Sequence, residues 1–121
     1  MVNKVILIGR LGRDAELRFT PQGTPVASLS LATERTWQDQ EGTNHKETEW
    51  HNVILWGRLA ETSHEHLTKG RLIYIEGRLH TRTWEDEQQA KHSRTEVIVE
   101  DLRYLDRPRG QTSTPEEDIP L

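Results

Sequence analysis

Apolar and polar residues alternate along several short segments of the chain. Over 26–37, Ala27, Leu29 and Leu31 lie on one side of an extended backbone, opposite two serines, which is the pattern of a half-buried strand. Turn-forming residues separate this segment from its neighbours, most clearly the Pro-Gln-Gly-Thr-Pro run at 21–25. The pattern predicts strands at 2–8, 26–37, 47–58, 71–84 and 95–105, with a short strand piece at 17–20.

One segment predicts a helix instead. Residues 59–67 follow the third strand, and Lys69 and Gly70 mark the end of that helix. Five strands with one short helix between the third and the fourth predict an all-β fold, the OB-fold, which is a partly open five-stranded barrel. We expect the first strand to end in a bend at Gly9 and residues 85–93 to form a polar loop. No internal repeat is apparent.

The composition changes after residue 105. The segment 106–121 lacks the apolar residues that would offset the entropy lost when a chain becomes ordered. We therefore expect a single domain at 1–105, followed by a flexible, acidic C-terminal tail at 106–121.

Two of the predicted strands place aromatic and basic side chains on one face. In the third strand Trp50, Trp56 and Arg58 share one side, while Val53 and Leu55 share the other and are assigned to the core. In the fourth strand the same alternation gives an inward set of Ile73, Ile75 and Leu79 and an outward set that includes Arg78, Arg82 and Trp84. Aromatic planes for bases and cations for phosphates are what a protein needs to bind single-stranded nucleic acid.

Trp37 does not follow this scheme. It has the parity of Leu29 and Leu31, so strict alternation points its indole into the barrel. A bulge or a strong twist near Arg35 would be needed to bring it out. Packing in the core is the alternative for all four tryptophans.

The charge balance limits where a nucleic acid could bind. The formal net charge is -4 over 121 residues, so a polyanion must meet a locally basic surface. The absence of cysteine excludes disulfides and thiolate metal sites. No signal peptide or membrane-length apolar segment is apparent, which predicts a soluble cytoplasmic protein that makes no membrane contact.

Two other classes of function are alternatives, an enzyme and an RNA-binding or accessory protein. His64 and His66 flank Glu65 as the one candidate metal cluster, but residues two apart on a helix do not face each other. With no nucleophile, phosphate-loop or paired-acid motif, we expect no enzymatic activity, no metal site and no cofactor. An RNA-binding or primosome accessory protein of the same fold is the second alternative, because RNA also stacks on aromatic platforms.

Several ordered motifs resemble one known family. The segments VNKVILIG, LGRD, RFTP, LAT, TEWH, GRLAE, LTKG and YIEGRL follow one another between residues 2 and 79. Together they resemble the bacterial single-stranded DNA-binding proteins, over residues 2–105 and again at 116–121. The resemblance implies a cytoplasmic, nucleoid-associated OB-fold homotetramer that binds single-stranded DNA without sequence preference and recruits replication, recombination and repair proteins.

The resemblance also implies specific contact residues. It places stacking aromatics at the positions of Trp37, Trp50, Trp56 and Trp84, which overrules the parity of Trp37, and a subunit contact at His51. The backbone of the DNA is expected to meet the basic residues Lys4, Arg10, Arg18, Arg35, Arg58, Lys69, Arg78 and Arg82.

The C-terminal end resembles the partner-binding tip of the same family. Acidic side chains and the terminal carboxylate can pair with basic residues around a pocket that takes up the apolar end. The residues of this tip are Glu116, Glu117, Asp118, Ile119, Pro120 and Leu121. The family usually ends in phenylalanine, so Leu121 is a departure, and the acidic tip favours the DNA-binding reading over a pure RNA binder.

Overall fold

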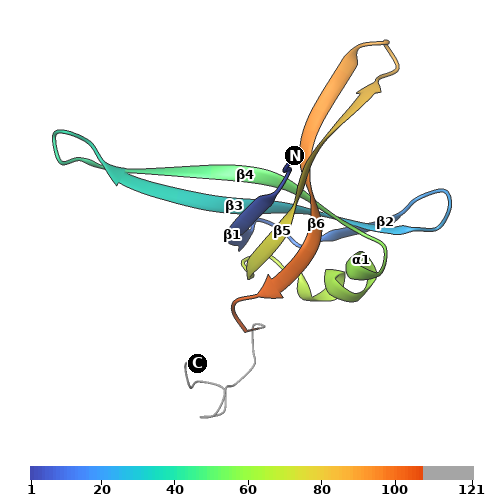
Figure 1. Cartoon of the computed structure of the whole chain (residues 1–121), viewed down its shortest axis with the longest axis horizontal. Coiled ribbons are helices and arrows are strands. Elements are labelled where there is room, and N and C mark those ends of the chain that lie inside the picture. The colour runs from blue at the N-terminus through green and yellow to red at the C-terminus, as the bar shows by residue number, and fades with distance from the viewer. Residues whose placement is uncertain (108–121) are drawn as a thin grey trace.

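The computed structural model describes residues 1–107, in which five long strands close into a barrel (Figure 1). Neighbouring strands follow the order β1-β5-β6-β4-β3, and β3 pairs back with β1 to close the ring. All these pairings are antiparallel except that of β4 with β6. The strands are β1 (Val5–Leu11), β3 (Pro25–Gln38), β4 (Asn44–Trp56), β5 (Leu72–Glu85) and β6 (Lys91–Tyr104). The predicted five-stranded barrel is confirmed, with the short strand β2 (Glu16–Phe19) added beside β3.

Alternating apolar residues fill the barrel as the sequence predicts. The fully buried side chains of β3, β4 and β5 come from single parities along each strand, and they include Leu31, Val53, Leu55, Ile73 and Ile75. The predicted helix is confirmed between β4 and β5 as α1 (Arg58–Ser63), continued by the 3-10 helix η1 (His64–His66). Ala60 of α1 and Leu67 after η1 are fully buried, so the helical segment completes the core.

Three hairpins extend from the barrel as arms, formed by β2 with β3, β3 with β4, and β5 with β6 (Figure 1). The predicted loop at 85–93 is too long, because the β5–β6 ladder continues to the pair Glu85 and Lys91. Likewise β4 starts at Asn44 rather than at 47. A two-stranded ribbon outside the barrel is exposed on both faces, so its residues need no apolar alternation and the pattern underestimates its length.

Two glycines mark places where barrel strands approach closely. β1 does not end at Gly9 but passes through it to Leu11. A Cβ at Gly9 would lie 2.2 Å from the carbonyl oxygen of Ala32, and one at Gly77 would lie 2.1 Å from that of Ile98, so neither site has room for a side chain. The β5–β6 register shifts beside Gly77. Leu79, predicted to face the core, is 49% exposed, because it belongs to the outer part of β5, in which every residue from Arg78 onward is exposed.

Asp106, the first residue of the predicted tail, is attached to the barrel. Its carboxylate accepts hydrogen bonds from the Arg71 guanidinium at 2.8 Å and from the backbone N–H of Leu72 at 3.0 Å. The rest of the predicted tail from residue 108 onward, including the tip at 116–121, lies outside the described residues. Among residues 1–107, no helix has the length and apolar character needed to cross a membrane.

Candidate nucleic-acid interface

The outward side of β4 presents two tryptophans. Trp50 is 57% and Trp56 is 48% exposed, while Val53 and Leu55 between them are fully buried. The predicted alternation of this strand is therefore confirmed, and core packing is not the fate of either indole. Asn52 and Ile54 lie on the same outward side of β4 as these two tryptophans.

Trp50 lies against a glycine of the loop after β1. A Cβ at Gly12 would meet the indole at 2.4 Å from Cζ3, so the ring occupies the space that any side chain at position 12 would need. Arg13 and Arg94 line the same hollow, of about 370 Å³, and the Arg94 guanidinium donates a hydrogen bond to the amide oxygen of Asn52. These two arginines are basic neighbours of Trp50 that sequence analysis missed, since their contacts join distant segments.

Trp56 lines a groove of about 340 Å³ that also contains an aromatic residue missed in the sequence. Phe19 on β2 is 64% exposed and lies in this groove with Arg18 and Arg82. Two carboxylates are also present, Glu16 bonded to Arg18 at 2.6 Å and Glu96 to Arg82 at 3.4 Å. One signal in the sequence could have indicated this second aromatic plane. Phe19 is the only phenylalanine of the chain, and it lies in a short strand beside a turn.

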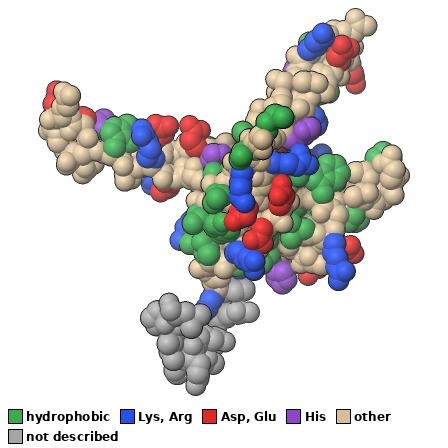
Figure 2. Space-filling model, in the orientation of Figure 1, with side chains coloured by type: hydrophobic (Ala, Val, Ile, Leu, Met, Phe, Trp, Pro, Cys, Tyr) green, Lys and Arg blue, Asp and Glu red, His purple; other side chains and the backbone are tan. Residues whose placement is uncertain are grey.

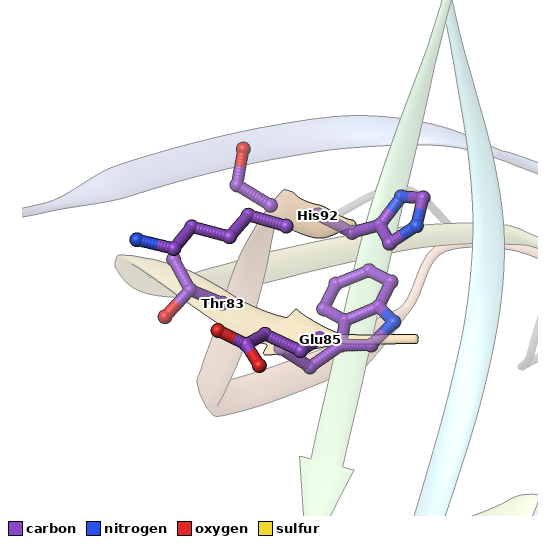
Figure 3. Close-up of a pocket in the computed structure, with 6 residues that line it drawn as sticks. Thr83, Glu85 and His92 are labelled. Carbon is purple, nitrogen blue, oxygen red and sulfur yellow. The ribbon is translucent and has the colours of Figure 1, made fainter. Parts of the chain in front are cut away.

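The other two tryptophans lie near the ends of two arms. Trp37 stacks on His45 across the β3–β4 hairpin, with ring centroids 5.3 Å apart and planes inclined by 21°. Trp84 stacks on His92 across the β5–β6 hairpin, with ring centroids 5.5 Å apart and the same inclination. Figure 3 shows the pocket beside this pair, with His92 on one strand and Thr83 and Glu85 on the other. Each indole is 39% exposed.

Trp37 reaches the surface without a bulge. The β3–β4 register runs unbroken from the pair Val26 and Trp56 to the pair Gln38 and Asn44. Trp37 therefore keeps the parity of the buried Leu29 and Leu31, and its indole is exposed because the hairpin has left the barrel by that point. The sequence parity was right, and the bulge near Arg35 was an unnecessary expectation.

An aspartate fixes each stacked histidine. At one hairpin, Asp39 accepts hydrogen bonds from His45 Nε2 at 2.8 Å and from the backbone N–H groups of Glu41 and Thr43 at 2.9 Å each. The bond from His45, followed by that from the Thr43 N–H, holds the pKa of Asp39 below its usual value. Because these groups stabilise the charged carboxylate, this aspartate stays ionised throughout the neutral range.

The second hairpin repeats this arrangement. Asp86 accepts from His92 Nε2 at 2.8 Å and from the backbone N–H groups of Gln88 and Ala90 at 2.9 Å each. The bond from His92, followed by that from Ala90, lowers the pKa of Asp86 in the same way.

The predicted basic residues are all exposed but differ in their surroundings. The guanidinium carbons of Arg35 and Arg82 lie 4.5 and 4.6 Å from the ring centroids of Trp37 and Trp84. Lys4 pairs with Glu76 at 3.3 Å, and Arg18 pairs with Glu16 at 2.6 Å. Arg10 bonds to the carbonyl of Gly70 at 3.0 Å. Arg58 begins α1, Lys69 precedes the Gly70 turn, and Arg78 lies on β5.

Basic and acidic side chains are mixed over the visible surface, along the arms as well as on the barrel (Figure 2). On the face shown, the cations stand in small groups among carboxylates, and several arginines lie beside the tryptophans. Each such group can meet one or a few phosphates, which suits a flexible strand that bends from one group to the next.

The remaining predicted residues are placed as follows. His51 on β4 is half-buried, and its Nε2 lies 2.8 Å from the Thr33 hydroxyl of the same chain. His64 and His66 lie in η1, and no group of three histidine, aspartate or glutamate side chains within residues 1–107 is arranged to hold a metal ion. The tip residues 116–121 are outside the described part.

Comparison with known proteins gives a consistent result. The model of the Single-strand binding protein family matches residues 2–105. A solved structure of a Plasmodium falciparum SSB in complex with ssDNA is 34% identical, with a TM-score of 0.78, and the match covers 88% of this chain and 96% of that one. A deletion mutant of the single-stranded DNA binding protein from Thermus aquaticus is 37% identical, with a TM-score of 0.77 and coverage of 91% of this chain but 53% of that one.

Proposed function

The chain belongs to the single-strand binding protein family, a non-enzymatic family that binds single-stranded DNA, and we propose that it coats such DNA during replication, recombination and repair. The observation that carries this proposal is the exposure of four indoles, each with a guanidinium or a basic groove beside it. Every base has a flat face, so stacking on these planes does not depend on sequence.

DNA rather than RNA is the ligand favoured by the comparisons. Aromatic stacking alone does not distinguish the two polymers. The similar Plasmodium falciparum protein was solved with ssDNA, and the similarity covers 88% of this chain. We therefore assign the four tryptophans, with Phe19 as an additional plane, to contacts with DNA bases.

The DNA proposal predicts the effect of removing one indole from the barrel and one from an arm. Stacking contributes about 1–3 kcal/mol per base, so Trp50→Ala combined with Trp84→Ala should weaken binding of poly-dT by at least about 30-fold. Fluorescence quenching of the remaining indoles, measured at fixed salt, would report the affinity. Leu105→Ala, which shortens an exposed apolar residue away from the interface, is the control. Undiminished affinity of the double variant would reject the stacking assignment.

We also propose that the protein assembles into a homotetramer, using two different surfaces of β1. Along the edge facing β3, the β1 pairing includes only Arg10 and Leu11. Among the described residues, no strand pairs with Val5–Ile8 on that edge, which can therefore pair with the same edge of a second copy. The outward face of the same strand carries Ile6 and Ile8, 55% and 53% exposed. A tetramer built on two-fold symmetry axes needs at least two different self-complementary interfaces, and an edge and a face supply them.

The third part of the proposal concerns residues 116–121, the acidic and apolar tip. We propose that this tip binds replication, recombination and repair proteins through paired charges and an apolar plug. Deleting residues 116–121 should abolish capture of such proteins from a lysate while leaving binding of poly-dT equal or slightly tighter, because an anionic segment no longer competes for the cations. Replacing the three acidic residues by Gln tests the charge separately. Retained capture after the deletion would show that the partners bind elsewhere.

A further inference from the structure

The two hairpin ends carry the same four side chains at the same spacing. The sequence RTWQDQEGTNHK at 35–46 corresponds to RTWEDEQQAKHS at 82–93. Arg, Trp, Asp and His recur in that order, at 35, 37, 39 and 45 in the first segment and at 82, 84, 86 and 92 in the second. This is an internal repeat that sequence analysis did not find. We call the two segments the hairpin tips.

The geometry of the two hairpin tips is also the same. Trp37 and His45 are directly opposite each other in the β3–β4 ladder, as Trp84 and His92 are in the β5–β6 ladder. The ring separations of 5.3 and 5.5 Å and the common inclination of 21° agree. The guanidinium distances of 4.5 and 4.6 Å also agree. Two hairpins with different turn sequences thus build one arrangement of rings with a guanidinium beside each indole, and Arg82 additionally bonds to Glu96 at 3.4 Å.

The aspartate links each turn to its ring. Through one carboxylate oxygen it accepts two backbone N–H groups of the turn, and through the other it accepts the histidine Nε2. The imidazole is therefore held at a fixed place relative to the backbone, and it lies against the indole. The two indoles are each 39% exposed, and they lie on two-stranded arms that extend away from the barrel (Figure 1).

We propose that each hairpin tip is a separate nucleotide-binding unit, in which Asp39 with His45 and Asp86 with His92 are positioning residues for the indole. The indole receives one base, and Arg35 or Arg82 moves from the ring to the adjacent phosphate. This inference rests on the proposed binding of single-stranded DNA, and adds that the two arms bind it in the same way. The benefit is pre-organisation, since an indole already held in one orientation loses less freedom when a base stacks on it.

The test compares histidine and arginine variants by affinity and by salt dependence. Titrations with oligo-dT at several salt concentrations and at one fixed pH give a dissociation constant and a log-log salt slope. His45→Ala and His92→Ala should each weaken binding by about two- to tenfold, to a similar extent, and leave the slope unchanged. Arg35→Ala should reduce the slope by about 0.7, the value for one phosphate contact with a single strand.

Two controls make the result specific. His64→Ala removes an imidazole from η1, away from both hairpin tips, and should bind as the parent does. His45→Phe keeps a flat ring against Trp37 but cannot bond to Asp39, and should recover part of the affinity lost in His45→Ala. A role in closing the turn alone would give no such recovery.

The outcomes that reject this inference differ from those that reject the proposed function. If the parent protein does not bind oligo-dT, the proposed function fails. If the parent binds and both histidine variants bind equally well, or one loses affinity and the other does not, only the equivalent positioning role fails. A salt slope that falls in His45→Ala would also reject it, because the imidazole would then contact phosphate or the whole hairpin tip would have been lost.

Discussion

Arg71 is a buried cation, and its environment shows how a single residue joins the segment before β5 to the end of β6. Only 6% of it is exposed, and its guanidinium donates to Asp106 Oδ1 at 2.8 Å and to the carbonyl of His66 at 3.0 Å. The ring of Tyr104 lies 4.6 Å from the guanidinium carbon. Burial of a charge without such partners would be strongly destabilising, so Arg71 requires Asp106.

The pKa of the Asp106 carboxyl is lowered, although burial and hydrogen bonding act on it in opposite directions. Burial acts to raise the pKa, but the backbone N–H of Leu72 and the guanidinium of Arg71 outweigh it, and the pKa of Asp106 lies below its usual value. A carboxyl whose pKa is lower in the folded state stabilises the fold above its unfolded pKa of about 3.9. That contribution is lost as the pH falls through the folded pKa.

Asp106→Asn should therefore destabilise the protein in a pH-dependent way. At pH 7 the variant should lose about 3 kcal/mol of unfolding free energy, because a buried guanidinium loses its charged partner. The difference from the parent should shrink as the pH falls below about 4, the ordinary pKa of an aspartate, because the parent's carboxylate is then also neutralised. Urea unfolding at fixed protein concentration would measure it. Asp101→Asn, which removes an exposed pair with Arg103, should cost less than about 1 kcal/mol. A cost for Asp106→Asn that is equal at pH 7 and pH 2 would contradict the ion-pair account.

At the same scale, the sequence predicted which side chains face outward but not what supports them. Trp50 and Trp56 follow from alternation with the buried Val53 and Leu55. The contact of Trp50 with Gly12 joins segments far apart in the chain, and no local pattern carries that information. Phe19 and Arg94 were missed for the same reason. Phe19 of β2 shares a groove with Trp56, and Arg94 of β6 shares a hollow with Trp50, and both contacts arise only when the strands are placed together.

At the scale of elements, prediction succeeded where one face of a strand is buried and failed where none is. The barrel portions of β3, β4 and β5 show period-two apolar patterns because the core occupies one side only. The arms have water on both faces, so residues 85–93 were assigned to a loop although residue 85 and residues 91–93 continue the β5–β6 ladder. The same reasoning explains Trp37, whose parity is that of the core but whose position is beyond it.

The hairpin tips show a second limit at this scale. Their repeat consists of a few side chains separated by turn residues that differ, Gln40 to Asn44 in one and Glu87 to Lys91 in the other. The turn residues are free to vary because the backbone N–H groups, not the side chains, bond to the aspartate. Only the matched distances in the folded hairpins reveal that the shared residues form one unit.

At the scale of the whole molecule, one side of β1 is used within the chain and another is left open. Its inward residues pack on the core, and its pairing with β5 extends from Val5 to Arg10. Its other edge from Val5 to Ile8 and its outward isoleucines are left without partners within residues 1–107. Exposed apolar residues beside an open strand edge favour association with another chain, which is the physical basis of the homotetramer proposed above.

Disrupting the isoleucine face should therefore separate the tetramer into dimers rather than monomers. Ile6→Asp with Ile8→Asp places two carboxylates on that face but leaves the backbone edge of β1 able to pair. Sedimentation equilibrium should give the parent four times the chain mass of 14.1 kDa and the double variant twice that mass. Phe19→Asp, a change at an exposed apolar residue of β2, should leave the mass at four chains. A monomeric parent would reject the assembly, and a tetrameric double variant would show that this face is not one of its two interfaces.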